Sequence, residues 1–201
     1  MRIFANILIF AGIGLLLFIF GPTLKEEAKY NLDKVARVKY VVGTEQLSTF
    51  EKPLTPPDED FSIIIPKIAA VAPIVANVDA SDPNKYLTAL RRGVAHAAGT
   101  KYPGEEGNVL LFAHSTDAFY NIGRYNAIFY LIGKLNTGDE IDIFYRGKLI
   151  KYEVYDKKVV GADSSEYFGT IGEGKTLTLQ TCYPPGTTLK RLVVLAKEVS
   201  S

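Results

Sequence analysis

Two apolar runs near the C-terminus, separated by a proline-rich turn, constrain the fold of this chain most strongly. In Thr176–Cys182 apolar side chains alternate with polar ones, and a period of two is typical of a half-buried β-strand. The segment Tyr183-Pro184-Pro185-Gly186 ends that strand, because proline cannot donate a ladder hydrogen bond. Arg191–Ala196 is a second apolar run. If the two runs pair as antiparallel neighbours, Cys182 lies beside Arg191 at one edge of a sheet.

The chemistry-bearing side chains near this edge are few. Cys182 is the only cysteine in 201 residues, and a thiol beside a fixed positive charge can become a reactive thiolate. His114, one of two histidines, ends the apolar run Asn108–His114, which has strand character. Cys182, His114 and Arg191 therefore fit a nucleophile, a proton donor and an anion-stabilising group. The residues alone leave another interpretation open, because a lone cysteine or histidine is more often a buried core residue.

The same residues resemble the sortases, which are membrane-anchored cysteine transpeptidases of the bacterial cell surface. The resemblance covers residues 61–199. Its first motif is Thr-Leu-x-Thr-Cys near the end of this range, with an arginine nine residues later and Ala-His some 70 residues upstream. Its further motifs are Ile65-Pro66-Lys67-Ile68, Gly93-Val94-Ala95-His96, Gly99-Thr100, Pro103-Gly104-Glu105, Gly107-Asn108 and Leu135-x-x-Gly138-Asp139. One position departs from the pattern, since Ala113 stands where many sortases have glycine.

The resemblance implies a role for each site residue. Cys182 is implied as the nucleophile, His114 as the general acid and base, and Arg191 as the group that contacts the substrate carbonyl or oxyanion. Thr181 occupies the position that often helps to hold the substrate backbone, and His96 corresponds to a non-catalytic histidine. The implied fold is mainly β, a closed eight-stranded sortase-like β-barrel with a few short helices.

The implied function is that of a cell-surface transpeptidase, most like class D or E. Such an enzyme cleaves a sorting signal similar to Leu-Pro-x-Thr-Gly through a thioacyl intermediate and transfers the protein to an amine. The implied partners are proteins bearing a C-terminal sorting signal and an amine from a cell-wall precursor or a pilin. Two alternatives stay open: a surface cysteine peptidase with water as acceptor, and a membrane-tethered β-barrel interaction module with an inert buried cysteine.

Composition excludes several other classes of protein. The net charge is +1 and no long basic run is present, so the chain lacks the pattern of a nucleic-acid-binding surface. One cysteine cannot form an intramolecular disulfide. The two histidines and the cysteine are far apart in sequence and no P-loop or G-x-G-x-x-G is present, so we expect no metal or other cofactor.

The N-terminus carries a long uncharged stretch, Ile3–Phe20, of 18 residues. As a helix it would measure about 27 Å, close to the ~30 Å hydrocarbon core of a bilayer. A cleavable signal peptide is the alternative, but its apolar region is normally shorter and ends in a small-x-small site. We therefore expect residues 1–24 to form a signal-anchor transmembrane helix. With the family resemblance, this places the protein in the cell membrane, single-pass, with its catalytic domain outside.

The remaining chain divides into two parts. Residues 25–60 read as a juxtamembrane helix to about Tyr40 and a proline-rich linker, and residues 61–201 as the catalytic β-barrel. Strands are expected at 61–65, 71–77, 93–97, 108–114, 140–145 and 148–160, besides the two C-terminal runs. Pro73 predicts an edge or a bulge, Asp82 a helix N-cap before residues 83–90, and Arg146-Gly147 a hairpin turn.

Three further groups invite a functional interpretation, but each has a plainer one. Tyr120, Tyr125, Phe129 and Tyr130 could line a substrate groove, although most aromatic residues pack in cores. Asp58, Glu59, Asp60, Glu105 and Glu106 could bind Ca²⁺, as some sortases do, although acidic clusters are usually solvated and no calcium loop is present. Asp117 could orient the His114 imidazole or could cap a helix.

Overall fold

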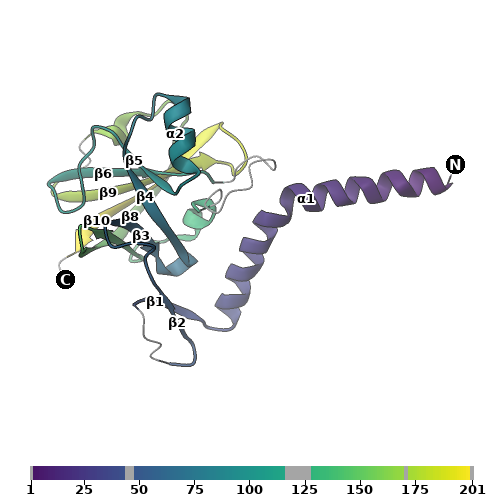
Figure 1. Cartoon of the computed structure of the whole chain (residues 1–201), viewed down its shortest axis with the longest axis horizontal. Coiled ribbons are helices and arrows are strands. Elements are labelled where there is room, and N and C mark those ends of the chain that lie inside the picture. The colour runs from purple at the N-terminus through teal and green to yellow at the C-terminus, as the bar shows by residue number, and fades with distance from the viewer. Residues whose placement is uncertain (1, 44–47, 116–127, 170–171, 200–201) are drawn as a thin grey trace.

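The protein is a closed β-barrel with a long helix extending from it (Figure 1). The computed structural model describes residues 2–43, 48–115, 128–169 and 172–199. Its helices and 3-10 turns are α1 (Arg2–Val35), η1 (Pro66–Ile68), α2 (Pro83–Leu90), η2 (Tyr130–Lys134) and η3 (Glu166–Phe168). Its strands are β1 (Lys39–Val42), β2 (Glu51–Leu54), β3 (Phe61–Ile65), β4 (Ala70–Val78), β5 (Val94–Ala97), β6 (Gly107–Phe112), β7 (Glu140–Tyr145), β8 (Lys148–Gly161), β9 (Lys175–Tyr183) and β10 (Lys190–Val199).

Eight strands close the barrel in the order β10-β8-β7-β3-β4-β5-β6-β9, which confirms the predicted mainly-β, eight-stranded fold. The two-residue turn Arg146-Gly147 joins β7 to β8 as predicted, with φ values of 51° and 75°. Such positive φ angles at both central residues are what a hairpin turn needs to match the twist of its strands. Asp82 caps α2 as predicted, because its side chain accepts hydrogen bonds from the backbone N–H groups of Asn84 and Lys85.

The prediction for Pro73 was wrong about the edge. Closure of the barrel places β4 between β3 and β5, so Pro73 pairs with Ser62 inside the sheet. The irregular register lies slightly further along, between Val75 and Val78, where Asn77 has a φ of 57°. Next to this site Gly93 approaches the Pro73 carbonyl so closely that an added Cβ would lie 2.1 Å from the oxygen. Only glycine therefore fits at the start of β5.

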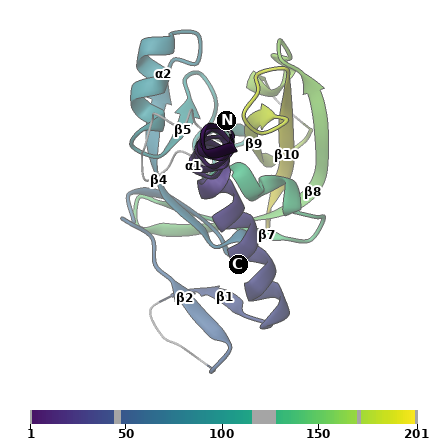
Figure 2. The ribbon, with the colours of Figure 1, turned by 90° about the vertical axis from the view of Figure 1, so that its right-hand side faces the viewer.

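The region before the barrel forms a long helix and a pair of strands, and not only a helix and a linker. A single helix, α1, runs to Val35, and it is followed by β1, which pairs in parallel with β2 (Figure 2). The pairing joins Lys39–Val42 to Glu51–Leu54, so part of the expected proline-rich linker is a strand. The second half of α1 contacts the barrel through the Glu27–Lys134 ion pair, at 2.6 Å, and through Tyr30, which packs against the core. The division of the chain at residues 24 and 60 stays a prediction.

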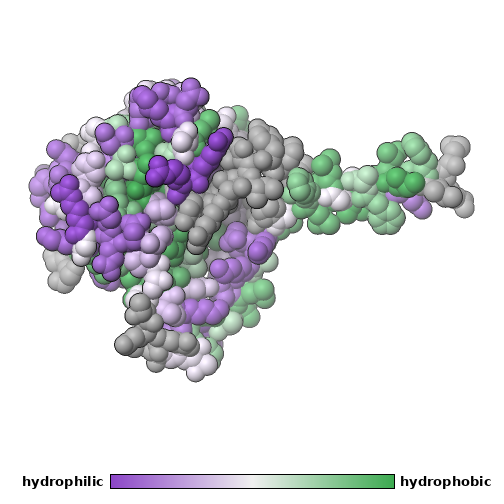
Figure 3. All heavy atoms as spheres, viewed as in Figure 1, coloured by the Kyte–Doolittle hydropathy of each residue, from purple (hydrophilic) through white to green (hydrophobic). Residues whose placement is uncertain are grey.

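The first half of α1 extends away from the barrel (Figures 1 and 3). The large apolar side chains between Phe4 and Phe18 are exposed, with fractions from 48% to 72%. The ribbon bends about midway, and the sequence has Gly21-Pro22 near the middle of this helix; a proline removes one helical hydrogen bond. Within the described residues, no helix combines the length and the apolar character that crossing a membrane requires. The membrane-spanning part of the predicted fold is therefore not confirmed.

One carboxyl group on the barrel is buried without a full set of partners. Asp142, on β7, has no exposed surface, and neither of its carboxyl oxygens has a hydrogen-bond partner among the described residues. The Lys151 ammonium on β8 lies 3.7 Å from it and also pairs with Glu140. Burial, and then the neighbouring Glu140, raise the pKa of Asp142 to about 7.

This raised pKa predicts how stability depends on pH. The unfolded chain releases the Asp142 proton near pH 4, whereas the folded protein keeps it to about pH 7, so wild-type stability should fall across that window. In Asp142→Asn the fall should be smaller, by up to about 4 kcal/mol at pH 8. Urea unfolding from pH 4 to pH 8 measures this, with the exposed Glu59→Gln as the control of equal charge. The same pH slope in wild type and Asp142→Asn would contradict the assignment.

Candidate active site

The last two strands bring the predicted nucleophile and the arginine together. In the antiparallel pair β9–β10, Cys182 lies directly opposite Arg191, which confirms the adjacency predicted from the sequence. Directly opposed residues of antiparallel strands have Cβ atoms about 4.5–5.5 Å apart. The thiol of Cys182 is free and only partly buried, so it is not the inaccessible core cysteine of the alternative interpretation.

His114 follows the strand on the other side of β9. Strand β6 runs parallel to β9, with Phe112 paired to Gln180. The backbone N–H of Ala113 then donates to the carbonyl of Gln180 at 3.2 Å. Continuing this register by two residues on each strand places His114 next to Cys182. His114 is half-buried, and its carbonyl accepts a hydrogen bond from the backbone N–H of Phe129 at 3.3 Å.

The three side chains also lie on one face of the sheet. Ala113 and Leu192, next to His114 and Arg191, belong to the core inside the barrel, as does Leu179, three residues before Cys182. Because successive strand residues point to opposite faces, Cys182, His114 and Arg191 point outward. All three lie where β6 and β9 end and β10 begins. The fold therefore gathers a thiol, an imidazole and a guanidinium at one end of the barrel wall.

The loop between β9 and β10 orients the arginine. The Arg191 Nη1 donates to the carbonyls of Thr188 and Lys190, each at 3.1 Å. A turn closed by the hydroxyl of Thr187, which donates to the Pro184 carbonyl at 2.8 Å, shapes this loop. Among the described residues, none accepts a hydrogen bond from Nε or Nη2 of Arg191, and these are further donors of the planar guanidinium.

Thr181 fixes the end of the strand that leads to His114. Its hydroxyl is buried and donates to the carbonyl of Ala113 at 2.8 Å. The hydrogen bond joins the residue before Cys182 to the residue before His114. In this structure the hydroxyl is thus directed toward the protein, and contact between Thr181 and the substrate backbone stays a prediction.

Comparison with known proteins decides the family. The family model described as the sortase domain matches residues 63–199, more than half of the chain. The chain belongs to the sortase family. It is 31% identical over 139 residues to Sortase D of Bacillus subtilis (strain 168), and the matched residues make up 68% of this chain. It is also similar to solved structures of Streptococcus agalactiae Sortase C1 (30% identity, TM-score 0.58, 70% of this chain and 67% of that one) and of Sortase A from Corynebacterium diphtheriae (27%, 0.59, 71% and 61%).

The family model matches the barrel, residues 63–199, and each of these relatives covers about 70% of this chain. The same match spans 62% of the length of Bacillus subtilis Sortase D. What the relatives share with this chain is therefore the domain that carries Cys182, His114 and Arg191.

Replacing Thr181 tests whether it positions the sortase site. Thr181→Val removes the hydroxyl but keeps the shape, and we expect a stability loss of about 1 kcal/mol and a lower kcat. Thr178→Val is the matched control, since the buried Thr178 hydroxyl on the same strand donates to Asn108 at 2.9 Å, further from His114. Thermal unfolding and turnover are measured for both variants. Equal losses of turnover at equal losses of stability would show that Thr181 is only structural.

His96 is a structural residue, as the resemblance implies. It is buried, its Nδ1 accepts a hydrogen bond from the backbone N–H of Asn77 at 3.2 Å, and its Nε2 lies 3.0 Å from the Lys101 carbonyl. A carbonyl can only accept, so this network assigns the proton to Nε2. Burial lowers the pKa of His96, which favours the neutral ring. It lies in the barrel wall and holds β4, β5 and the following loop together.

The other candidate residues divide between the core and the surface. Phe129 is fully buried in the core and Tyr130 packs against it, whereas Tyr120, Tyr125 and Asp117 lie outside the described residues. The carboxylate of Asp58 accepts from two backbone N–H groups, and that of Glu105 accepts from Tyr102, so both act locally. Across the described ranges no three His, Cys, Asp or Glu side chains form a group suited to a metal ion.

Sequence reasoning missed the structural role of Asn108, which lies at the start of β6, six residues before His114. Its side-chain oxygen accepts hydrogen bonds from Thr176 and Thr178, at 3.2 and 2.9 Å. Its amide nitrogen donates to the carbonyl of Tyr167 at 2.7 Å. One buried side chain thus joins β6, β9 and η3 at the end of these strands away from Cys182 and His114. The signal was present in the Gly107-Asn108 motif, but a polar residue at a strand start does not reveal its partners.

Proposed function

We propose that this sortase is a cell-surface cysteine transpeptidase whose catalytic residues are Cys182, His114 and Arg191. The observation that carries the proposal is the arrangement at the barrel end: Cys182 opposite Arg191 in the β9–β10 register and His114 at the end of the neighbouring β6, all on the outer face. A nucleophile with a proton carrier and a fixed cation each one strand away from it is what acyl transfer requires.

The proposed reaction has two halves. The Cys182 thiolate attacks a backbone carbonyl of the substrate, and Arg191 donates hydrogen bonds to the oxygen that becomes negatively charged. The carbon–nitrogen bond breaks, His114 protonates the leaving amine, and the acyl group remains on Cys182 as a thioester. An acceptor amine then gives its proton to His114 and attacks the thioester. A new amide bond forms and Cys182 is released.

The proposed substrates are proteins with a C-terminal sorting signal similar to Leu-Pro-x-Thr-Gly, and the acceptor is an amine of a cell-wall precursor or a pilin. This proposal rests on family membership, because the site residues specify acyl transfer but not the peptide. The 31% identity to Sortase D supports the class D interpretation of the sequence.

A ligation assay separates this function from the two alternatives. The protein is incubated with a library of five-residue signals, with and without an added amine, and the products are read by mass. A transpeptidase gives amine-ligated products that replace hydrolysis when the amine is present. A peptidase gives the hydrolysed peptide in both cases, and an interaction module gives no product.

We further propose that the first half of α1 anchors the enzyme in the cell membrane, with the barrel outside. The support is the run of exposed apolar side chains between Phe4 and Phe18, which extends away from the barrel (Figure 3). A helix that is apolar all round and exposed is unstable in water and is typical of a segment that a membrane or another apolar phase covers.

Removing residues 1–24 tests the anchor. The cut keeps Glu27 and Tyr30, which contact the barrel, and removes only the extended apolar half. We expect the shortened chain to leave the membrane fraction, to stay monomeric in solution and to keep its turnover of free peptide. Fractionation and the ligation assay check the two parts. Aggregation or loss of turnover would show instead that the apolar half packs with the barrel.

A further inference from the structure

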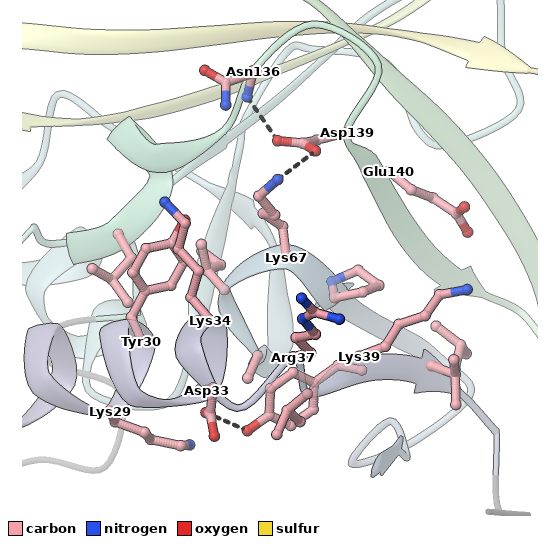
Figure 4. Close-up of a pocket in the computed structure, with 18 of the residues that line it drawn as sticks. Lys29, Tyr30, Asp33, Lys34, Arg37, Lys39, Lys67, Asn136, Asp139 and Glu140 are labelled. Atoms are coloured by element: carbon pink, nitrogen blue, oxygen red, sulfur yellow. Dashed lines mark hydrogen bonds and ion pairs between the residues drawn. The ribbon is translucent and has the colours of Figure 1, made fainter. Parts of the chain in front are cut away.

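A cleft beside α1 is separate from the proposed catalytic side chains. It has a volume of about 770 Å³ and lies between the second half of α1, strand β1 and the part of the barrel formed by η1, η2 and the start of β7 (Figure 4). Neither Cys182, His114 nor Arg191 is among its lining residues. Its volume is in the range of small-molecule sites, which is ~300–1,000 Å³.

The walls of this cleft carry more positive than negative side chains. Six basic residues line it: Lys29, Lys34, Arg37, Lys39, Lys67 and Lys151. Four acidic residues line it: Glu26, Asp33, Asp139 and Glu140.

Most of the acids are already paired. Asp139 lies 3.3 Å from Lys67, and Glu140 pairs with Lys151. Asp33 accepts a hydrogen bond from the Tyr40 hydroxyl at 2.8 Å and lies 3.8 Å from Lys52, outside the cleft.

Three of the remaining basic residues, Lys34, Arg37 and Lys39, form a cation cluster without an ion pair among the described residues, although Lys39 adds to the effect of Lys151 in lowering the pKa of Glu140. In the part of the chain that the structure describes, the side chains of Lys34, Arg37 and Lys39 make no ion pair and no hydrogen bond. Figure 4 shows the Arg37 guanidinium between Lys34 and Lys39, below the amine of Lys67, with Lys29 turned away on the other side of α1. Positive side chains that line one cleft without an ion pair make its potential positive, so the cleft is arranged to gain from a bound anion.

The backbone of Arg37 supports this interpretation independently of charge. Arg37 follows the last turn of α1 with a φ of 55°. The N–H of Arg37 donates to the carbonyl of Lys34 at 3.2 Å, and that of Val38 to Asp33 at 2.9 Å, which is the Schellman pattern of a helix end. Glycine is the usual residue there because other side chains are strained at positive φ. An arginine kept in a strained position beside a cleft points to a role for its side chain.

We propose that this cleft binds a phosphate-bearing anion, with Arg37 as its central ligand and Lys34 and Lys39 at its sides. The planar guanidinium offers two parallel donors that match the oxygens of a phosphate, and the lysines add charge without demanding a fixed geometry. The phosphate group could belong to a soluble compound or to the headgroup of an anionic phospholipid near α1. The site is separate from the proposed catalytic residues, so its test does not depend on turnover.

The test is a calorimetric titration of the full chain in a neutral detergent. Three titrants are compared: pyrophosphate, a short-chain phosphatidylglycerol, and a short-chain phosphatidylcholine as the control with no net charge. Arg37→Gly is the main variant, because glycine suits the positive φ and should keep or raise the thermal stability. Lys25→Ala is the matched control, since Lys25 is an exposed cation of α1 that does not line the cleft.

We expect Arg37→Gly to weaken binding at least about tenfold, as the loss of one charge-assisted hydrogen-bonding group predicts, and Lys25→Ala to leave it unchanged. Binding of pyrophosphate in this pattern identifies a soluble phosphate compound, and binding of phosphatidylglycerol alone identifies a headgroup. The proposal is overturned if neither titrant binds, if Arg37→Gly binds as wild type does, or if Lys25→Ala weakens binding equally.

Discussion

Replacing Cys182 with alanine is expected to abolish transpeptidation, with a fall of at least about 10⁴-fold in turnover. The reason is that covalent catalysis has no substitute nucleophile here, because the chain contains no other thiol. The fold should be preserved, since Cys182 is partly exposed at a strand end and alanine leaves only a small gap. Turnover is measured with the best signal of the ligation assay and an added amine.

Mass spectrometry gives this prediction a second readout. Wild type should carry an adduct with the mass of the acyl part of the substrate, and Cys182→Ala should carry none. Thermal unfolding of the variant controls for the fold. Turnover that persists in a folded Cys182→Ala protein would exclude the cysteine mechanism and with it the proposed function. An adduct on wild type that water alone resolves, even with excess amine, would favour the peptidase.

The parts of the fold that depend on local patterns could be predicted from the sequence. The alternation in Thr176–Cys182 shows which side chains face inward, because successive strand residues point to opposite faces whatever the partner strand is. Arg146-Gly147 between two apolar runs predicts a hairpin, and Asp82-Pro83 predicts a helix start, for similarly local reasons. The many short strands and few helices indicated a closed or nearly closed barrel, and the family resemblance implied that it has eight strands.

The parts that depend on distant contacts could not be predicted. Asp142 alternates with Ile141 and Ile143 as a surface residue should, yet it is fully buried. The pairing of β1 with β2 joins two short segments, one containing Pro53, that have no strand pattern of their own. Pro73 predicted an edge because a proline weakens a ladder, but a closed barrel has no edge strand.

The same distinction applies to the candidate sites. Cys182 and Arg191 are joined by one turn, so their adjacency followed from a single strand pair, whereas His114 lies 68 residues before Cys182 and reached it only through β6–β9 pairing. The cation cluster of the cleft beside α1 comes from the end of α1 and from β1, which line the cleft together with residues of the barrel. No sequence motif marks it, because an arginine and two lysines near a helix end have the pattern of ordinary surface residues.

The arginine offers two physical roles that a single substitution separates. If Arg191 acts only as a positive charge that favours the thiolate of Cys182, any cation at its position should serve. If it donates hydrogen bonds to the oxyanion, the planar group is needed, because Nη1 is already bound to the carbonyls of Thr188 and Lys190 and other nitrogens must reach the substrate. A lysine has one nitrogen and cannot make both sets of bonds in that geometry.

Arg191→Lys is therefore expected to lose most of its activity although the charge is kept. The removal of one oxyanion donor in other enzymes reduces turnover by about 10²–10³, and we expect a fall of that order in kcat for the lysine variant. Stability should change little, because Arg191 is partly exposed and its two hydrogen bonds join only its own loop. Turnover of Arg191→Lys and Arg191→Ala is measured side by side with thermal unfolding. Similar losses in both variants support the oxyanion role, since charge alone then contributes little, whereas near-wild-type turnover in the lysine variant would leave Arg191 as a general electrostatic partner of Cys182.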